Sequence, residues 1–362
     1  MKQWQETALI LDRLIQLGQA GRHAALATVT RIVGSAYRRA GAKLLIEDDG
    51  SVLGGVSGGC LEEDVRQAGL RVLRSGESRV LHYETGGDET RVWGLGLGCD
   101  GQVDLIVQPV APEAALGSWA RVRDLLREDS SFAIATIVAT GASRGIFAMG
   151  ESGPLASPWP DWAEDPALQA ATAAALRAQH SRLQDLGHAK LFVEVLLPPP
   201  KLLLCGAAED ARPLVALAAT VGFRVSVADH RPAHLEPQRL PEAHQLLLLR
   251  PDAASAELGV DSDTYAVVKT HSLKHDTAWV KRLIETEVAY LGILGPRART
   301  QKILAELGIA GDARVFGPVG LDLGADGPEQ VALSVVAELL AVRRGRQPRH
   351  LREQEVAVHA HA

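Results

Sequence analysis

Cysteine is scarce in this chain. Three cysteines, Cys60, Cys99 and Cys205, occur among 362 residues, and no two of them have the C-x-x-C spacing. Thiols so few and so widely separated do not form the disulfide framework of a small secreted domain. Because free thiols are ordinary in a reducing compartment, the composition predicts a cytoplasmic protein.

Positive charge and long apolar runs are also lacking. The formal net charge is -6, which leaves no basic stripe for the phosphates of nucleic acid, although a local basic cluster could bind a small anion. No apolar run reaches the about 18 residues of a membrane span. Charged residues such as Glu6 and Asp12 interrupt the amphipathic N-terminus, which predicts a surface helix and not a signal peptide. We therefore expect neither a nucleic-acid partner nor a membrane partner.

What is present is the composition of a folded α/β protein. Hydrophobic residues make up 46% and charged residues 23% of the chain, near the globular average. Residues 1–197 predict a mixed α+β domain, residues 198–200 are a proline linker, and residues 201–345 alternate apolar strands with helices. That alternation is typical of a Rossmann-like, doubly wound domain with a parallel sheet. The tail, residues 346–362, has no apolar period and is expected to be loose.

Two stretches of the first domain are alike. Residues 25–29 are ALATV and residues 133–137 are AIATI, and each stretch precedes a second apolar strand and a turn. The likeness indicates either an internal duplication or simply two similar strands, and both alternatives stay open. The second stretch has no counterpart of the SGGC that follows the first. Further on, the Ala-rich residues 164–186 predict one long helix.

The sequence GGVSGGCLEEDV, residues 55–66, has several interpretations. It contains the G-x-S-x-G of a nucleophile elbow around Ser57, but a predicted Asp-Asp-Gly hairpin precedes it, so its strand is antiparallel, unlike that of a hydrolase. Cys60 falls near the start of a predicted helix, where N–H groups and the helix dipole favour a thiolate, while the acidic residues 62–64 oppose it. The alternatives are a reactive thiol, a backbone anion cradle, and a small buried residue in a tight turn.

The turn after the first strand of the C-terminal domain occupies the position of a dinucleotide fingerprint. Of the G-x-G-x-x-G pattern only the first glycine, Gly206, is present, and Ala208 and Ala211 replace the others. The second glycine normally lets a phosphate approach the backbone, so its loss predicts poor nicotinamide binding. Asp229, 23 residues after Gly206, ends the next strand, where an acidic residue could hold a ribose.

Two more polar clusters follow strands of that domain. His271 and His275 are four residues apart, a spacing that on a helix could ligate a metal. His271 follows a predicted strand, however, which favours a polar rim of the ligand cleft or simple loop histidines. Arg297 and Arg299 follow Gly295 at a strand-to-helix turn, which is a second candidate anion cradle.

Taken together, these stretches resemble the XdhC/CoxI family. The segment GSAYRRAGAKLLIEDDGSVLGGVSGGCLEEDV resembles the N-terminal signature of that family, and GLGLGCDGQVDLIVQPV resembles its second motif, with Asp100 in place of a glycine. In the C-terminal half, ADHRP, VVKTHSLKHD and AYLGILGPRAR also fit. The resemblance is diagnostic over residues 23–110 and in the C-terminal half, and less so over residues 112–197.

The resemblance implies an accessory protein and not a catalyst. Members of the family are similar in function to chaperones that bind molybdenum cofactor, as molybdopterin or its nucleotide form, and protect it during sulfuration. They deliver it to a molybdenum hydroxylase of the xanthine dehydrogenase or aldehyde oxidoreductase type. The resemblance further implies a homodimer, a cysteine desulfurase partner and a client enzyme. The competing hypotheses are an NAD(P)-dependent oxidoreductase that uses the Rossmann-like domain, and a serine or cysteine hydrolase.

The chaperone hypothesis assigns cofactor-binding residues in both domains and no catalytic ones. Cys60 is expected to contact the molybdenum-sulfur end of the cofactor, with Cys99 as the second choice. The neighbouring cations Arg38 and Arg39 either contact an anion of the ligand or are solvated charges of the hairpin. The supporting residues of the first domain are Ser57, Gly58, Gly59, Arg38, Arg39 and Lys43. In the second domain a nucleotide portion would meet Gly206, Asp229, His271 and Arg297.

Overall fold

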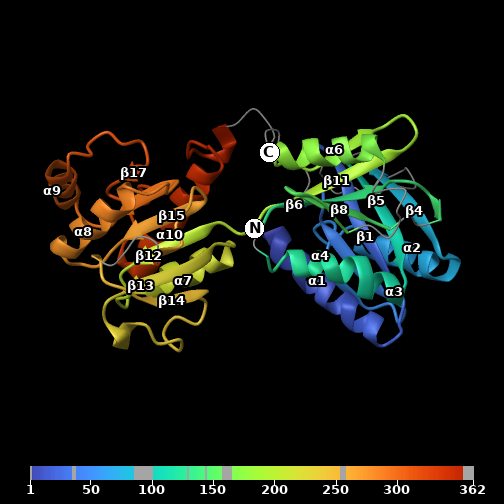
Figure 1. The fold of residues 1–362 in the computed structure, drawn as a ribbon, viewed down its shortest axis with the longest axis horizontal. Helices are drawn as coiled ribbons and strands as arrows, with labels where there is room; N and C mark the ends of the chain where they lie inside the picture. The colour runs from blue at the N-terminus through green and yellow to red at the C-terminus, as the bar shows by residue number, and fades with distance from the viewer. Residues whose placement is uncertain are drawn as a thin grey trace. The chain divides into compact units, whose positions relative to one another are not determined.

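The computed structural model describes residues 2–34, 38–84, 101–128, 130–142, 145–156, 165–252 and 258–353. Residues 2–198 form one compact unit and residues 199–350 form another, and Figure 1 labels the elements of both. Helices and strands occur in both units, which confirms the predicted α/β class. Among the described helices, none is both long and apolar enough to cross a membrane.

The first half of the N-terminal unit is a helix followed by an antiparallel sheet. The sheet has six strands in the order β3-β2-β1-β5-β4-β7. The predicted Asp-Asp-Gly hairpin is confirmed as β2 and β3, and the predicted helix after it begins at Glu62. The elements are α1 (Lys2–Gln19), β1 (Ala24–Gly34), β2 (Lys43–Glu47), β3 (Val52–Gly54), α2 (Glu62–Ser75), β4 (Glu77–Glu84) and β5 (Gly101–Val110).

The second half of the unit repeats this arrangement. Its five-stranded sheet has the order β9-β8-β6-β11-β10, which matches β3-β2-β1-β5-β4 strand for strand, and neighbouring strands are antiparallel in both. Along the chain, α2 lies between β3 and β4, and α6 lies at the corresponding place between β9 and β10. The elements are α3 (Pro112–Ala114), the π-helical turn η1 (Ala115–Trp119), α4 (Ala120–Leu125), β6 (Phe132–Ile137), β7 (Gly141–Ala142), β8 (Phe147–Gly150), β9 (Gly153–Ala156), α6 (Pro166–Arg177), β10 (Arg182–Asp185) and β11 (Lys190–Leu196).

The residue register favours an internal duplication as the origin of the likeness. Across four neighbouring strands, the paired residues are Leu44, Ala27, Val107 and Arg79 in the first repeat and Phe147, Ala135, Val193 and Arg182 in the second. Ala27 and Ala135 are equivalent residues of the two similar stretches noted in the sequence. Leu44 and Phe147 are 103 residues apart, and so are Arg79 and Arg182, so one constant spacing relates β2 and β4 to β8 and β10. This favours a duplication over merely similar strands.

The helices of the two repeats agree as well. Val65 of α2 and Leu168 of α6 are both buried and lie 103 residues apart. Gly76 and Gln179, also 103 residues apart, both have positive φ, 72° and 50°, and so end their helices in the same way. The predicted long helix over residues 164–186 is therefore wrong beyond Arg177, because the chain turns at Gln179 and then forms β10.

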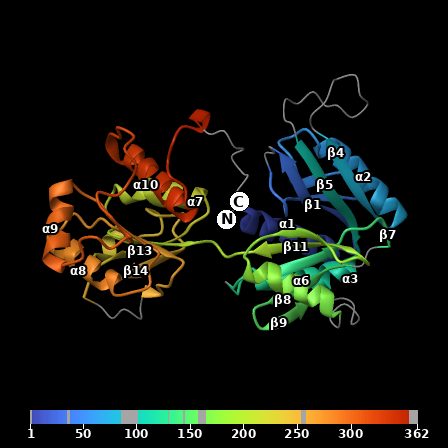
Figure 2. The same ribbon diagram turned by 90° about the horizontal axis from the view of Figure 1, so that it is seen from above.

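Each sheet of the N-terminal unit is covered on two faces. The central apolar cluster joins α1, η1 and α4 to the inner faces of both sheets through Leu14, Trp119 and Phe132 among others. The outer face of the first sheet packs under α2, and the outer face of the second packs under α6 (Figures 1 and 2). The helix that begins each repeat thus lies between the sheets, and the helix inside each repeat lies outside.

The C-terminal unit is a parallel sheet in the order β14-β13-β12-β15-β16-β17. This is the Rossmann order, in which the connections change direction between β12 and β15, so the predicted doubly wound fold is confirmed. Apolar residues of α7 and α10 cover one face, and those of α8 and α9 cover the other (Figure 1). The elements are β12 (Lys201–Cys205), α7 (Ala211–Thr220), β13 (Arg224–Asp229), η2 (Pro232–His234), β14 (Gln245–Leu248), β15 (Thr264–Val268), α8 (Leu273–Ile284), β16 (Tyr290–Ile293), α9 (Arg297–Leu307), β17 (Val315–Phe316), α10 (Gly327–Arg343) and η4 (Leu351–Glu353).

Candidate functional site

The glycine turn, residues 55–61, leaves the β2–β3 hairpin and enters α2. At Gly54 φ is 97°, and a Cβ there would lie 2.5 Å from the carbonyl oxygen of Lys43, so only glycine fits. The N–H of Gly55 donates to that same oxygen at 2.8 Å. Val56 then buries its side chain in the core. The sheet therefore fixes the start of the turn.

Ser57 closes the turn on itself. Its Oγ accepts hydrogen bonds from the backbone N–H groups of Gly59, Cys60 and Leu61, at 3.2, 3.1 and 3.1 Å. The same hydroxyl donates its proton to the carboxylate of Glu62. Ser57 thus satisfies N–H groups of the turn just before α2, which begins at Glu62.

Glu62 completes the network from the other side. Its Oε1 accepts from the N–H of Ser57 at 2.8 Å and from the N–H of Val56 at 3.2 Å. Burial by itself would raise the pKa of Glu62, but the hydrogen bonds from Ser57 and Val56 outweigh it, and the pKa lies below its ordinary value. The sequence analysis assigned Glu62 no role in closing the turn and treated it as a charge opposing a Cys60 thiolate. The usable signal was a carboxylate in the first turn of a helix that follows a glycine-rich loop.

This network changes the interpretation of the turn. The N–H groups that were expected to cradle an external anion already donate to oxygen atoms of Ser57 and Glu62. An incoming anion would first have to displace the Glu62 carboxylate. Because the Ser57 hydroxyl donates to a carboxylate and not to a histidine base, the geometry also gives no support to a hydrolase elbow. The turn is a preassembled platform for its own residue Cys60.

The side chain of Cys60 is exposed and its thiol is free. Within the described residues, nothing lies within 4 Å of the Cβ position at the preceding Gly59, so the space beside Cys60 is open. The alternative of a small buried residue at this position is therefore wrong. Cys99 lies outside the described residues, so its convergence with Cys60 stays a prediction.

The cations expected near the hairpin have partners within the protein. Arg38 pairs with Glu6 of α1, with Nη1 at 3.1 Å from Oε1, while Arg39 is exposed. Lys43 is buried, and its Nζ lies 2.5 and 2.6 Å from the two carboxylate oxygens of Glu194. The expectation that Lys43 supplies positive charge to a ligand is wrong, because this ion pair joins β2 of the first repeat to β11 of the second.

In the C-terminal unit, the turn after β12 lies at the point where the sheet order reverses. Gly206 has φ of 117°, and a Cβ there would lie 2.5 Å from the carbonyl oxygen of Lys269 at the end of β15. The glycine is thus required for close approach of two backbone segments. The N–H of Ala207, which in a dinucleotide-binding turn would face the pyrophosphate, donates instead to Asp229 Oδ2 at 2.8 Å.

Asp229 is buried, and its acceptor positions are filled. Besides Ala207, the carboxylate accepts from Arg231 through the backbone N–H at 2.9 Å, Nε at 3.0 Å and Nη2 at 2.9 Å. Burial acts to raise the pKa of Asp229, but these hydrogen bonds dominate and hold the pKa well below its ordinary value. The suggested contact between Asp229 and a ribose therefore stays a prediction. It requires that Arg231 first releases the Asp229 carboxylate.

The carboxyl ends of β12 and β15 hold a second closed set of charges. Asp210 accepts from the buried Nζ of Lys269 at 2.6 Å and lies 2.9 Å from Nε2 of His271, which has φ of 62°. Burial lowers the pKa of Lys269, and its contact with Asp210 partly offsets this effect. His271 therefore lies on the polar rim of the switch point, as one of the sequence alternatives had it. Lys269, which the sequence analysis did not single out, is the cation at its centre.

The remaining residues predicted in this unit lie close by. The buried Asp276 pairs with Arg299 and accepts from the N–H of Thr270 at 2.9 Å, while Arg297 is exposed at the start of α9. His275 packs edge-on against His230 with ring centroids 4.7 Å apart. The described residues include no cluster of three or more metal-ligating side chains, which disfavours the metal alternative for the histidine pair.

Two family models match this chain. Residues 17–84 match the model described as the XdhC and CoxI family, and residues 202–339 match the one described as the XdhC Rossmann domain. The first match contains the Ser57–Cys60 turn, and the second contains the whole switch-point cluster.

Similar full-length proteins are also known. A Bacillus subtilis protein, named as a probable subunit of xanthine dehydrogenase, is 35% identical over 338 residues, which are 92% of this chain and 97% of that protein. The molybdenum cofactor insertion chaperone PaoD of Escherichia coli is 25% identical over 92% of this chain and 88% of its own. A crystal structure from Bacillus halodurans, described as a xanthine dehydrogenase, superposes with a TM-score of 0.73 at 28% identity and covers 93% of this chain and 96% of that one.

Proposed function

Because this chain belongs to the XdhC and CoxI family, we propose that it is an accessory protein for insertion of molybdenum cofactor. In this role it binds the cofactor as cargo, protects it while its terminal sulfur is installed, and delivers it to a molybdenum hydroxylase. The likeness to a named cofactor insertion chaperone over most of both chains supports the proposal. The name of the Bacillus subtilis relative supports a client of the xanthine dehydrogenase type, and a client of the aldehyde oxidoreductase type belongs to the same proposal.

The observation that carries the proposal is the exposed thiol of Cys60 on a closed turn. Thiolate is a soft ligand and suits a metal already bound to sulfur. The turn needs no reorganisation to present it, since Ser57 and Glu62 satisfy the surrounding N–H groups. Cys60 would contact the molybdenum-sulfur end of the cargo, with Cys99 as the second thiol. Ser57, Gly58 and Gly59 act here by holding the thiol in place.

The anionic end of the cargo needs a cation, and the structure sets conditions on each candidate. In the N-terminal unit, Arg38 would have to leave Glu6, and Arg39 extends from the exposed surface. In the C-terminal unit, a nucleotide portion would meet Gly206 and His271 at the switch point, with Asp229 and Arg297 at its borders. These assignments belong to the proposal, as do a cysteine desulfurase partner, a homodimer and a cytoplasmic location.

A nicotinamide-dependent oxidoreductase is the less favoured alternative. The strand order of the C-terminal unit suits a dinucleotide, but the N–H of Ala207 is occupied by Asp229 and Asp210 stands at the start of α7. Two carboxylates thus lie where a pyrophosphate needs donors and positive potential. Saturable NADH binding in a fluorescence titration would revive this alternative.

The test is retention of the cargo. The protein is purified from cells that make molybdenum cofactor, and bound pterin is measured by fluorescence after oxidation and molybdenum by mass spectrometry. We expect both signals above those of an unrelated control protein. We also expect Cys60→Ala to lose most of the molybdenum while Ser51→Ala, a change on the adjacent hairpin, retains it. Absence of both signals from the unmodified protein would exclude the chaperone role.

A further inference from the structure

The N-terminal unit contains a cavity where the start of β1 and the end of β5 meet η1, and we call it the η1 cavity. It encloses about 360 Å³, at the lower end of the range of small-molecule sites. The exposed His23 and Gly76 lie at its mouth, and the buried Gln108 and Trp119 line its inner part. Because no residue assigned above to the cargo lines it, the η1 cavity is a separate site.

The other repeat has a counterpart of the inner wall. Gln108 of β5 pairs with Leu26 of β1, and Glu194 of β11 pairs with Ile134 of β6. Leu26 and Ile134 each lie one place before the equivalent alanines of the two repeats. Gln108 in the first repeat therefore corresponds to Glu194 in the second.

The facing walls correspond in the same way. Lys43 and Ile146 are 103 residues apart, which is the spacing that relates β2 to β8. Gln3 and Ala111 are 108 residues apart, which is the spacing that relates β1 to β6. Lys43 thus corresponds to Ile146 and Gln3 to Ala111, and both Ile146 and Ala111 line the η1 cavity.

The counterpart is filled by its own side chains. Nζ of Lys43 lies 2.5 and 2.6 Å from the carboxylate oxygens of Glu194, and Nε2 of Gln3 donates to Oε1 of Glu194 at 2.7 Å. In the η1 cavity an isoleucine replaces the lysine, an alanine replaces the glutamine, and the amide of Gln108 replaces the carboxylate. The shorter apolar side chains do not reach across, so the space that is closed in the counterpart stays open here.

The lining of the η1 cavity selects an uncharged ligand. The side chains of Gln108, Ser118 and Trp119 have no hydrogen-bond partner in the part of the chain that the structure describes. The described lining contains no carboxylate, ammonium or guanidinium group, so a charged ligand would lose its hydration without a counter-charge. The apolar part of the lining consists of Pro109, Val110, Ala111, Ala114 and Ile146.

We propose that the η1 cavity binds a small uncharged molecule that has a carboxamide head on an apolar body. The amide of Gln108 is both a donor and an acceptor, so it pairs with a carboxamide through two hydrogen bonds. Trp119 offers its indole N–H as a further donor. The apolar walls then enclose the body of the ligand, and binding does not depend on the role proposed for Cys60.

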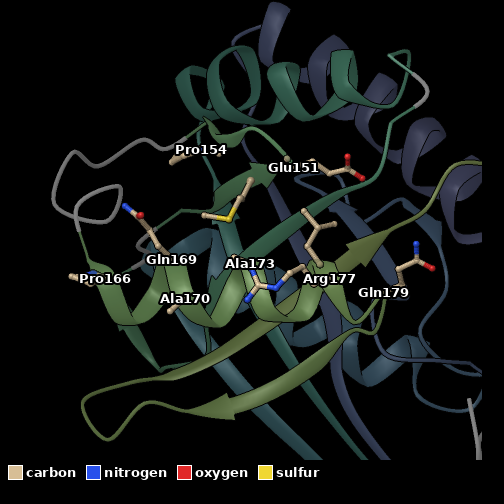
Figure 3. Close-up of a pocket in the computed structure, with 12 residues that line it drawn as sticks. Glu151, Pro154, Pro166, Gln169, Ala170, Ala173, Arg177 and Gln179 are labelled. Carbon is tan, nitrogen blue, oxygen red and sulfur yellow. The ribbon is translucent and has the colours of Figure 1, made fainter.

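A larger hollow in the second repeat provides a control. It lies between α6 and the turn that joins β8 to β9, and it encloses about 640 Å³ (Figure 3). Figure 3 shows the charged side chains of Glu151 and Arg177 at its border, which distinguishes it from the η1 cavity. Ala173 of α6 lines this hollow and is the matched position for a control substitution.

The test is a titration of benzamide into the full chain, followed by ligand-observed NMR. We expect saturable 1:1 binding with a Kd below ~1 mM. Ala111→Gln, which copies Gln3, should weaken that binding by about tenfold or more. Ala173→Gln adds the same side chain to the other hollow and should leave it unchanged. Benzylamine, a cation of similar size, should bind at least about tenfold more weakly than benzamide.

A second substitution tests the amide contact. Gln108→Leu should weaken benzamide about fivefold to tenfold and leave toluene, which lacks the head group, nearly unaffected. If Ala111→Gln does not fold, Ala114→Leu closes the same space. The proposal is overturned if benzamide does not saturate below ~1 mM, if a folded cavity-filling variant binds as well as the unmodified chain, or if Gln108→Leu weakens both probes equally.

Discussion

Removing the Glu62 carboxylate should open the turn that presents Cys60. Glu62→Ala leaves the N–H groups of Val56 and Ser57 without their acceptor and deprives the Ser57 hydroxyl of the group that orients it. A hydrogen bond to a charged group contributes about 1.5–3 kcal/mol. A local loss of that size raises the population of the open turn roughly tenfold to a hundredfold.

Amide hydrogen exchange measured by mass spectrometry reports this opening directly. Peptides that contain residues 56–61 should exchange faster in Glu62→Ala by that factor. Alkylation of Cys60 should then no longer report on one single conformation of the turn. Glu63→Ala is the matched control, since Glu63 is its exposed neighbour and pairs with Arg66 and Gln67 on the helix surface. If exchange over residues 56–61 rises equally in both variants, Glu62 does not organise the turn.

The stabilisation of the turn by Glu62 depends on pH in a definite direction. The folded-state pKa of Glu62 lies below the ordinary value of 4.5 because hydrogen bonds to the carboxylate outweigh the effect of burial. The stabilisation is therefore present above that ordinary value and is lost as the pH falls through the folded-state pKa. The difference in exchange between the unmodified chain and Glu62→Gln, corrected for intrinsic rates, should shrink as the pH is lowered below 4.5.

Three further changes test other parts of the structure. In the folded protein iodoacetamide should modify the exposed Cys60 and spare Cys205, whose burial raises its pKa; equal labelling in a peptide map would refute the burial. Lys43→Met leaves Glu194 buried without its cation and should cost about 3–5 kcal/mol in urea unfolding, with partial recovery when Glu194→Gln is added. Gly206→Ala forces a Cβ to 2.5 Å from a backbone oxygen and should lower thermal stability more than Gly308→Ala, where the described residues leave that space open; the reverse order would contradict the close approach.

The helices, strands and turns around the site could be predicted because each of them depends on a short stretch of sequence. The Asp-Asp-Gly hairpin, the helix after Cys60 and the strand-turn-helix at Gly206 all depend on turn chemistry and apolar periodicity within a few residues. The exposure of Cys60 was left open, because a thiol at a helix start packs inward or outward according to how the preceding turn is closed.

The contacts that determine the geometry of the candidate site join residues far apart in the sequence, so they could not be predicted from short stretches. Lys43 has the sequence context of a surface hairpin, yet its partner Glu194 lies 151 residues away in the second repeat. Asp229 has the spacing of a ribose ligand, but the filling of its acceptor positions depends on the side-chain conformation of Arg231. The duplication was open for a related reason. Five similar residues say little about it, whereas the same strand order in both halves and the one spacing that relates β2 and β4 to β8 and β10 support it.

The two repeats also explain why Glu62 and not another acid holds the turn. Asp165, 103 residues later, stands at the corresponding place and points forward, where its Oδ1 accepts from the N–H groups of Ala167 and Leu168 at 2.9 and 3.2 Å as a helix cap. In the first repeat Ser57 accepts from N–H groups of the turn before the helix, and Glu62 reaches backward to the N–H groups of Val56 and Ser57. A backward reach needs the longer side chain, so Glu62→Asp should speed exchange over residues 56–61 nearly as much as Glu62→Ala. Asp165→Ala should cost about 1 kcal/mol of cap stability and leave Cys60 unaffected. Slow exchange in Glu62→Asp would show that charge alone, without reach, is enough to hold the turn.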